Sequence, residues 1–202
     1  MKSFFNLFAK SYSEMFGENR SANLRCMVTT ALLIAVSMAL EALTIQLPFA
    51  KVNFAFIAVA AIGMLYGPFV AFFATGICDV VGYIAHPDGM FIPAYILIAM
   101  LQGLIYGLVL YRGWGDMNIR ERTAEFTARV VAARLLDVLI INLFLNTAAN
   151  LHYGFIAADS LGAALSVRVT KNLLELIADI PLLLALLPAI NAAYNSVRGR
   201  NR

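Results

Sequence analysis

Residues 54–85 read FAFIAVAAIGMLYGPFVAFFATGICDVVGYIA, an apolar run that contains a single charged residue. The run is long enough to cross a membrane, since a spanning helix needs about 20 apolar residues. Gly67 and Pro68 interrupt it, because proline cannot donate a helical hydrogen bond and restricts the residue before it. We therefore expect a short helix over 54–66 and a second helix over 68–85, with proline as a favourable first residue.

The composition of the whole chain also indicates a membrane protein. Of its 202 residues, 61% are hydrophobic and 13% are charged, whereas soluble domains have about 45–50% and about 25%. Six spans with short loops use up this length, so no separate soluble domain fits. The formal net charge of +3 comes from Lys and Arg residues at segment ends, where they orient spans, and it predicts no nucleic-acid partner.

Further apolar runs predict the remaining helices. They cover, approximately, residues 26–47, 91–111, 126–145 and 161–197. Turn-forming or polar stretches separate the helices at 48–53, 86–89, 112–125 and 146–160. The expected fold is an all-α integral membrane protein, a bundle of six transmembrane helices.

The positions of the cations predict the orientation of this bundle. In a six-span arrangement, Lys51 and Arg168 fall on one side and most other cations fall on the opposite side. Because Lys and Arg are enriched in cytoplasmic loops, we expect both the N- and the C-terminus in the cytoplasm. We divide the chain into a cytoplasmic or interfacial segment at 1–23, a transmembrane domain at 24–197 and a cytoplasmic tail at 198–202.

The N-terminal segment has a helical pattern of its own. Phe4, Phe8, Tyr12 and Phe16 recur every four residues, which indicates a helix with one aromatic face. A helix of this kind lies in the membrane interface. A disordered leader is the alternative.

Charged residues inside the apolar runs are the main candidates for function, because each costs roughly 2.5–3.5 kcal/mol at the membrane centre. They are Asp79, Arg134 and Asp137, and then Arg168, Lys171, Glu175 and Asp179 in the last helix. The last four follow one another at spacings of three and four residues, so they share one helix face. Either these charges pair with one another inside the bundle, or the two cations near the outer end form an anion-binding pocket.

Small residues line one face of the first spanning helix. Ala31, Ala35 and Ala39 are four residues apart, and this spacing allows another helix to approach closely. That helix belongs either to the same chain or to a partner protein.

No enzymatic motif accompanies these residues. His86 and His152 fall in predicted loops, and neither has the spacing to Ser, Cys, Glu or a second His that catalytic triads and HExxH sites require. Cys26 and Cys78 form no metal-ligand cluster. We expect no catalytic residue, no metal and no cofactor, and we keep a small intramembrane enzyme and a structural membrane subunit as alternatives.

Seven short stretches form a more specific combination. They are Gly67-Pro68, Asp79-Val80-Val81-Gly82, PDGMFIP at 87–93, LQGLIYGL at 101–108, Leu145-Asn146-Thr147, Tyr153-Gly154 and RVTKNL at 168–173. Together they resemble the energy-coupling factor (ECF) S-components of the folate type. Two places differ: PAYIL at 93–97 stands where the family has Pro-Gly-x-Thr-Leu, and Ser166-Val167 stands where it has Pro-Ala.

The resemblance implies a substrate-binding subunit of a vitamin importer, built from six helices in the bacterial plasma membrane and without enzymatic activity. It implies a transmembrane coupling subunit and two cytosolic ATPase subunits as partners. The face formed by Ala31, Ala35 and Ala39 would be the docking surface. The subunit would topple in the membrane to release its substrate inward.

The resemblance also implies folate or a reduced folate as the ligand, and the residue chemistry fits. Arg168 and Lys171 could hold the carboxylates of a glutamate tail, while Asp79 could accept two adjacent N–H groups of a pterin edge. The further contacts expected are the aromatic faces of Tyr83, Phe91 and Tyr95 and the adaptable amide of Asn146. A queuosine precursor, pantothenate or thiamine is the alternative ligand.

Overall fold

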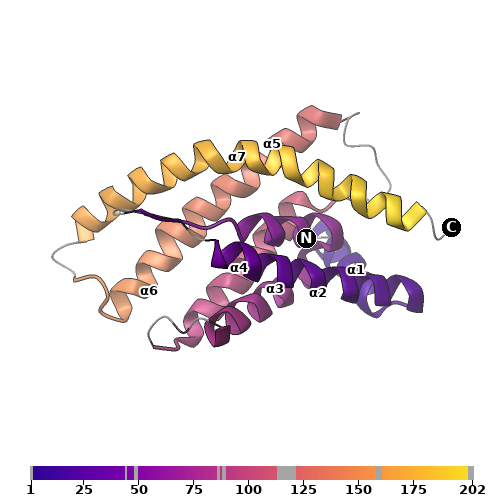
Figure 1. Ribbon diagram of the computed structural model, residues 1–202, viewed down its shortest axis with the longest axis horizontal. Helices are drawn as coiled ribbons and strands as arrows, with labels where there is room; N and C mark the ends of the chain where they lie inside the picture. The colour runs from indigo at the N-terminus through magenta and orange to yellow at the C-terminus, as the bar shows by residue number, and fades with distance from the viewer. Residues whose placement is uncertain are drawn as a thin grey trace.

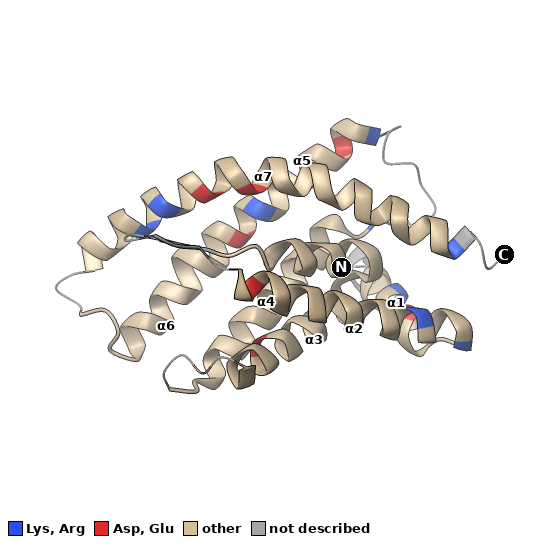
Figure 2. Ribbon diagram, viewed as in Figure 1, with Lys and Arg blue, Asp and Glu red and all other residues tan. Residues whose placement is uncertain are grey.

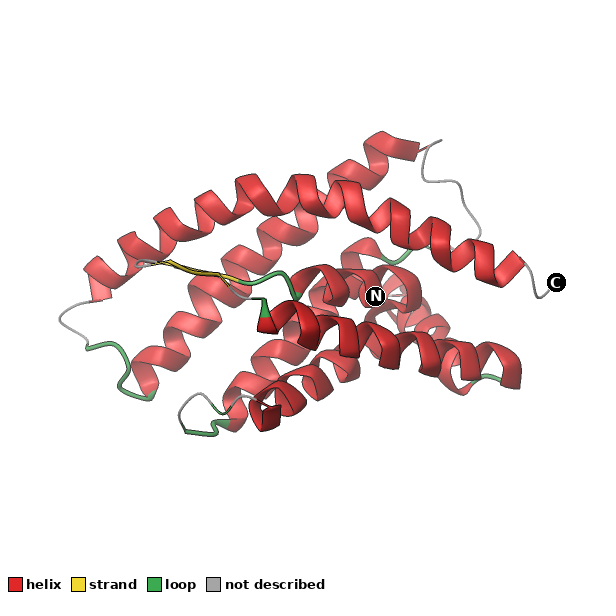
Figure 3. Ribbon diagram, in the orientation of Figure 1, coloured by secondary structure: helices red, strands yellow, loops and turns green. Residues whose placement is uncertain are grey.

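The computed structural model is a bundle of helices with one short β-hairpin (Figure 1 and Figure 3). It describes residues 2–43, 45–47, 50–85, 87, 90–112, 122–157 and 161–199. Its elements are α1 (Lys2–Phe16), α2 (Arg20–Ala42), β1 (Ile45–Leu47), β2 (Ala50–Val52), α3 (Phe56–Ala85), α4 (Pro93–Leu110), α5 (Thr123–Leu136), η2 (Asp137–Leu145), α6 (Asn146–His152) and α7 (Leu161–Gly199). Helix α7 runs along most of the molecule (Figure 1).

Helix α3 is central to the bundle and contains the predicted break. It contacts α1, α2, α4 and α7, and every residue from Phe56 to Pro68 is buried. At Gly67 the backbone has φ of +83°, a conformation that glycine adopts without the steric cost of a Cβ. The break therefore divides α3 into the two helices that the sequence predicted.

Apart from α1, the described part of the chain contains six helical segments, which confirms the predicted fold class. Four helices, α2, α3, α4 and α7, are each long and apolar enough to cross a membrane. The break makes two segments of α3. The sixth segment is the continuous rod formed by α5, η2 and α6.

The first spanning helix ends earlier than predicted. Helix α2 stops at Ala42 and not at residue 47. The chain then forms a hairpin in which β1 pairs antiparallel with β2, with Ile45 opposite Val52. Proline disfavours helical geometry in the residue before it, so Pro48 disfavours a helix that continues to residue 47.

The fifth helix is longer than predicted. Residues 146–152 form α6 and not the start of an exposed loop, and His152 ends a helix. The polar residues here bond and pack within the bundle: Thr147 is buried, and the Asn150 side chain donates to the Asn146 carbonyl. The polar residues of 146–152 thus belong to a helix that packs in the bundle. The sequence pattern alone does not distinguish such a helix from a polar loop.

Helices α3 and α4 pack closely at the break. A Cβ on Gly107 of α4 would lie 2.4 Å from the Pro68 Cα atom, which is too close for two carbon atoms that are not bonded. Small residues let membrane helices approach to backbone contact. Gly107 therefore fixes the position of α4 against the broken helix.

Helix α1 caps the second half of α3. The Ser11 side chain is fully buried, and its Oγ donates to the Tyr66 carbonyl at 2.5 Å. The same Oγ accepts from the backbone N–H groups of Phe69 at 3.1 Å and Val70 at 3.3 Å. The first N–H groups of a helix have no carbonyl partner inside it, so a residue of α1 supplies the acceptor that the helix start at Pro68 lacks.

We expect Ser11→Ala to lower the stability of the purified chain in detergent. The substitution leaves backbone groups at the break without a partner, at about 1–3 kcal/mol for each buried group. The matched control is Ser13→Ala, because the Ser13 hydroxyl is exposed and bonds only the Lys10 carbonyl within α1. Equal apparent melting temperatures for the two variants would contradict the capping role of Ser11.

Candidate functional site

A cavity of about 270 Å³ lies inside the bundle, lined by residues of α2, α3, α4, α5, η2 and α7. Its charged lining residues are Glu41, Asp79, Arg134, Lys171, Glu175 and Asp179. Charged side chains within membrane helices are costly, and they mark either internal pairs or ligand pathways. The partners of each charge therefore decide what the cavity can bind.

Asp79 of α3 lines the cavity without a partner. Among the described residues, none forms a hydrogen bond or an ion pair with its carboxylate. An ionised carboxylate in apolar surroundings is unfavourable unless hydrogen-bond donors satisfy it. A ligand that presents N–H groups to Asp79 would supply them.

Arg134 of α5 is held by two carboxylates. Its guanidinium donates to Asp137 from the same helical rod and to Asp179 from α7. The Arg134 side chain is 6% exposed, and those of Asp137 and Asp179 are 0% and 4% exposed. The Phe56 ring lies 4.7 Å from the guanidinium carbon. This arrangement joins the fifth and last helices through a buried charge network.

Helix α4 completes that network with two polar side chains. The Gln102 amide donates to Asp137 at 2.9 Å, and the Tyr106 hydroxyl donates to the same carboxylate at 3.3 Å. Arg134 in turn donates to the Tyr106 hydroxyl at 3.2 Å. The carboxylate of Asp137 is thus saturated by protein groups, so it is not available to a ligand.

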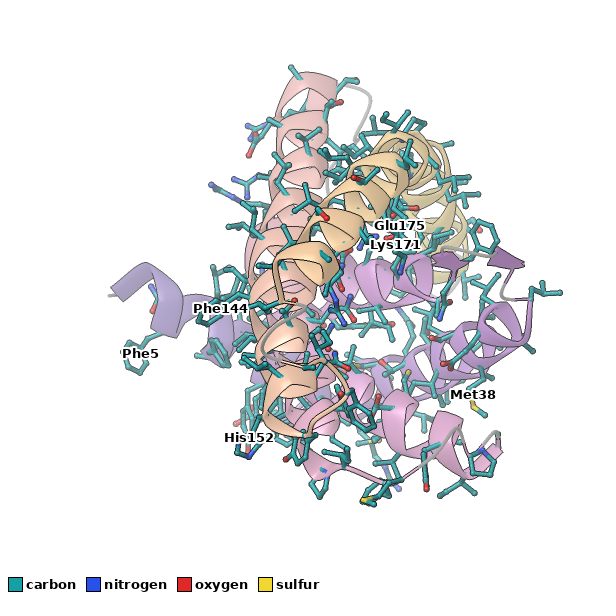
Figure 4. All side chains as sticks on the ribbon, turned by 90° about the vertical axis from the view of Figure 1, so that its left-hand side faces the viewer. Phe5, Met38, Phe144, His152, Lys171 and Glu175 are labelled. Atoms are coloured by element: carbon teal, nitrogen blue, oxygen red, sulfur yellow. The ribbon has the colours of Figure 1, made fainter. Side chains whose placement is uncertain are left out.

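Lys171 pairs with Glu175 one turn further along α7, with Nζ and Oε1 3.3 Å apart. Figure 4 shows the two side chains next to each other on this helix. Internal pairing therefore applies to Lys171, as it does to Arg134. With four carboxylates and two cations in its lining, the cavity has a negative formal charge.

A second polar cluster lies one turn from Lys171 and consists of Tyr95, Thr147, Asn150 and Arg168. Arg168 donates to the Thr147 hydroxyl at 3.4 Å, and the Tyr95 hydroxyl donates to the Asn150 amide oxygen at 3.3 Å. Within the described residues Arg168 has no carboxylate partner. We call these four residues the Arg168 cluster, and its cation is free to bind an anion.

The remaining predicted contacts lie apart from the cavity lining. The rings of Tyr83 and Phe91 contact each other at 5.0 Å between centroids, and Phe91 is 45% exposed. Asn146 donates weakly to the Asn142 amide oxygen at 3.5 Å, and Asn142 itself lines the cavity. The structure thus brings Asp79 and Lys171 together in one cavity, while the other predicted contacts are not among its lining residues.

Sequence reasoning missed three lining residues that carry a charged or amide side chain inside a helix. They are Glu41 at the end of α2, Gln102 in α4 and Asn142 in η2. Each is a polar residue inside a predicted apolar run, so the cost argument that selected the charged residues could have found them. Among the described residues, no three His, Cys, Asp or Glu side chains come together as a metal site.

The alanine face of α2 lies on the outside of the chain. Ala31, Ala35 and Ala39 are all exposed, whereas Leu33 and Ser37 of the same helix are buried. The small residues therefore do not pack against another described helix of this chain. They leave a shallow surface on which a helix of another protein could lie.

We expect Arg134→Met to destabilise the chain strongly. Removal of the cation leaves two buried carboxylates without a charge partner, which costs about 3–5 kcal/mol. The matched control is Arg129→Met on the same helix, since Arg129 bonds the partly exposed Glu125 at 3.0 Å and the Val109 carbonyl at 2.8 Å. Each of these contacts contributes about 1 kcal/mol. Thermal unfolding in detergent measures both variants, and similar losses would contradict the network's structural role.

Comparison with known proteins assigns this architecture. The profile of the family described as "ECF transporter, substrate-specific component" matches residues 25–187. The "Folate transporter FolT" of Leuconostoc mesenteroides subsp. mesenteroides is 32% identical over 152 residues, which cover 74% of this chain and 77% of the relative. That of Clostridium novyi (strain NT) is 31% identical over 105 residues, which cover 52% of this chain and 55% of the relative.

A solved structure shares the fold of this chain. This structure, described as "Crystal structure of FolT bound with folic acid", superimposes on the present fold with a TM-score of 0.64 at 24% identity. The superposition covers 85% of this chain and 97% of the solved one. The match to the Clostridium novyi relative spans about half of that protein, whereas the family profile covers most of the chain. The chain belongs to the family of ECF transporter substrate-specific components, multi-pass proteins of the cell membrane.

Proposed function

We propose that this substrate-specific component captures folate or a reduced folate from outside the cell. The observation that carries the proposal is the unpartnered carboxylate of Asp79 in a cavity inside the bundle. A pterin edge presents adjacent N–H donors, and a carboxylate accepts two of them at once. The relatives named for folate transport support the choice of ligand.

The size and charge of the cavity support one orientation of this ligand. Its volume of about 270 Å³ is just below the range of about 300–1,000 Å³ for sites that enclose a whole small molecule. The flat, uncharged ring system fits its negatively charged lining better than the anionic tail does. We therefore place the ring end beside Asp79 and the glutamate tail outside the cavity.

The Arg168 cluster is the proposed site for that tail. Arg168 lies three residues before Lys171 on α7, on the same face of the helix, and Lys171 lines the cavity. A guanidinium binds a carboxylate through two parallel hydrogen bonds. Lys171 and Asn146 would assist, and Tyr83, Phe91 and Tyr95 would cover the path between tail and ring.

We expect the purified chain to bind folate, and Asp79→Asn and Arg168→Ala each to weaken binding. Loss of a charged hydrogen bond costs about 1.5–3 kcal/mol, which is at least about tenfold in affinity. Calorimetry measures the affinities. The controls are the exposed Glu18→Gln just before α2 and Arg20→Ala at its first residue, which remove the same charges. Unchanged affinity in both site variants would contradict the proposed contacts.

The same assay distinguishes the alternative ligands. A chain that ignores folate but binds a queuosine precursor, pantothenate or thiamine tightly would refute the proposed ligand and leave the family unaffected. We propose no catalytic activity for this chain. Turnover of any bound compound would contradict that.

The proposed partners are a transmembrane coupling subunit and two cytosolic ATPase subunits. We propose that the coupling subunit lies on the exposed face of Ala31, Ala35 and Ala39, because small residues allow close approach of another helix. The cations of α1 and of the beginning of α2 lie at the same end of the molecule as the end of α7 (Figure 2). This clustering supports cytoplasmic positions for both termini.

We expect Ala35→Leu to reduce co-purification with the coupling and ATPase subunits, since a larger side chain separates the two helices. Folate affinity should remain unchanged, because Ala35 is outside the cavity. The matched control is Ala128→Leu, at another exposed alanine on α5. Full co-purification of Ala35→Leu would place the docking surface elsewhere.

A further inference from the structure

Helix α1 (Lys2–Phe16) lies outside the part of the chain that the family profile matches. The family profile begins at residue 25, whereas α1 ends at Phe16. We infer that α1 is a membrane-surface helix, fixed to the protein at Ser11, whose edge of Phe5, Tyr12 and Phe16 inserts among the phospholipids of one leaflet. The inference does not depend on which ligand the cavity binds.

One side of α1 packs on the protein. Ser11 is fully buried at the break in α3, where its hydroxyl bonds the backbone on both sides of Gly67. Four residues along, Met15 packs against the buried core. Residues four apart lie on the same side of a helix, so this contact fixes the rotation of α1 about its own axis.

A second side of α1 is apolar and exposed. Phe5, Tyr12 and Phe16 are 67%, 50% and 52% exposed, and their spacings of seven and four residues place them along one edge of the helix. Figure 4 shows Phe5 projecting away from the helix bundle. An exposed aromatic edge is unfavourable in water. Tyr is enriched at the membrane interface, and Phe is typical of the apolar face of interfacial helices.

This edge continues onto the surface of a spanning helix. The Tyr12 ring lies 5.2 Å from the Phe69 ring of α3, and Phe69 lies 5.0 Å from Phe73. Phe73 is 47% exposed, on a helix long and apolar enough to cross the membrane. Because the aromatic row joins α1 to a surface that faces lipid, lipid is the occupant that fits the α1 edge.

The third side of α1 is polar. Asn6, Lys10 and Ser13 are exposed, and the Lys10 ammonium lies 5.6 Å from the centre of the Tyr111 ring. Other cations lie at the same end of the molecule (Figure 2). A helix with an apolar edge, a polar face and cations nearby suits a leaflet that contains anionic phospholipids.

Tryptophan fluorescence tests this placement in the full chain. Trp114 is the single tryptophan of the sequence, so Trp114→Phe gives a silent background, and Trp114→Tyr serves if that variant does not purify. Phe5→Trp then reports on the exposed edge and Ser13→Trp on the polar face of the same helix. Both proteins are reconstituted into vesicles of phosphatidylcholine and phosphatidylglycerol, with or without phosphatidylcholine brominated on its acyl chains.

The inference predicts that brominated lipid quenches the fluorescence of the Phe5→Trp protein several-fold more than that of the Ser13→Trp protein. Aqueous iodide should quench the two proteins in the opposite order. Equal quenching by iodide with no effect of brominated lipid would place α1 in water and overturn the inference. Protection of the Phe5→Trp fluorophore from both quenchers would show that protein covers the edge, as a docked partner or a second copy of the chain would, and would also overturn it.

Discussion

The arrangement of the helices depends on one buried guanidinium. Arg134 requires carboxylate partners because an unpaired charge inside a membrane bundle is strongly unfavourable, and it takes them from Asp137 beside it and Asp179 on α7. Gln102 of α4 bonds the first of these carboxylates. The network therefore fixes three helices that are far apart in the sequence, and it forms one wall of the cavity. In that wall every charge is paired, so we assign ligand binding to charged residues outside the network.

The broken helix supplies further lining of the cavity. Its second half carries Asp79 into the bundle, and the direction of that half is set by the turn at Gly67 and Pro68. Gly107 of α4 and Ser11 of α1 hold the turn from two sides, one by close backbone contact and the other by hydrogen bonds. The position of the Asp79 carboxylate thus depends on contacts at the turn, outside the cavity. Its proposed role in binding follows from the absence of a partner for it among the described residues.

Much of this structure could be predicted from the sequence, for identifiable reasons. The break at Gly67 and Pro68 follows from the covalent geometry of proline, and the charges in apolar runs identified Asp79 and Arg134 because burial makes charge rare. The carboxylates that pair with Arg134 were harder to predict from the sequence. Arg134 and Asp179 are separated by 45 residues, and several acidic residues were equally plausible partners. The cap at Ser11 was not predicted, because a serine in an amphipathic helix has no distinctive pattern. The predicted division of the chain at residues 23 and 197 remains a prediction.

The orientation proposed for the ligand follows from the separation of the unpaired carboxylate from the unpaired cation. Asp79 lies in a negatively lined cavity and Arg168 lies outside it, an arrangement suited to a ligand with a neutral hydrogen-bonding ring at one end and an anionic tail at the other. A crystal structure of the chain with folate bound is the most direct measurement. The account predicts the pterin edge within hydrogen-bond distance of the Asp79 carboxylate and the tail at Arg168. A ligand bound in reverse, or elsewhere with the cavity empty, would contradict it.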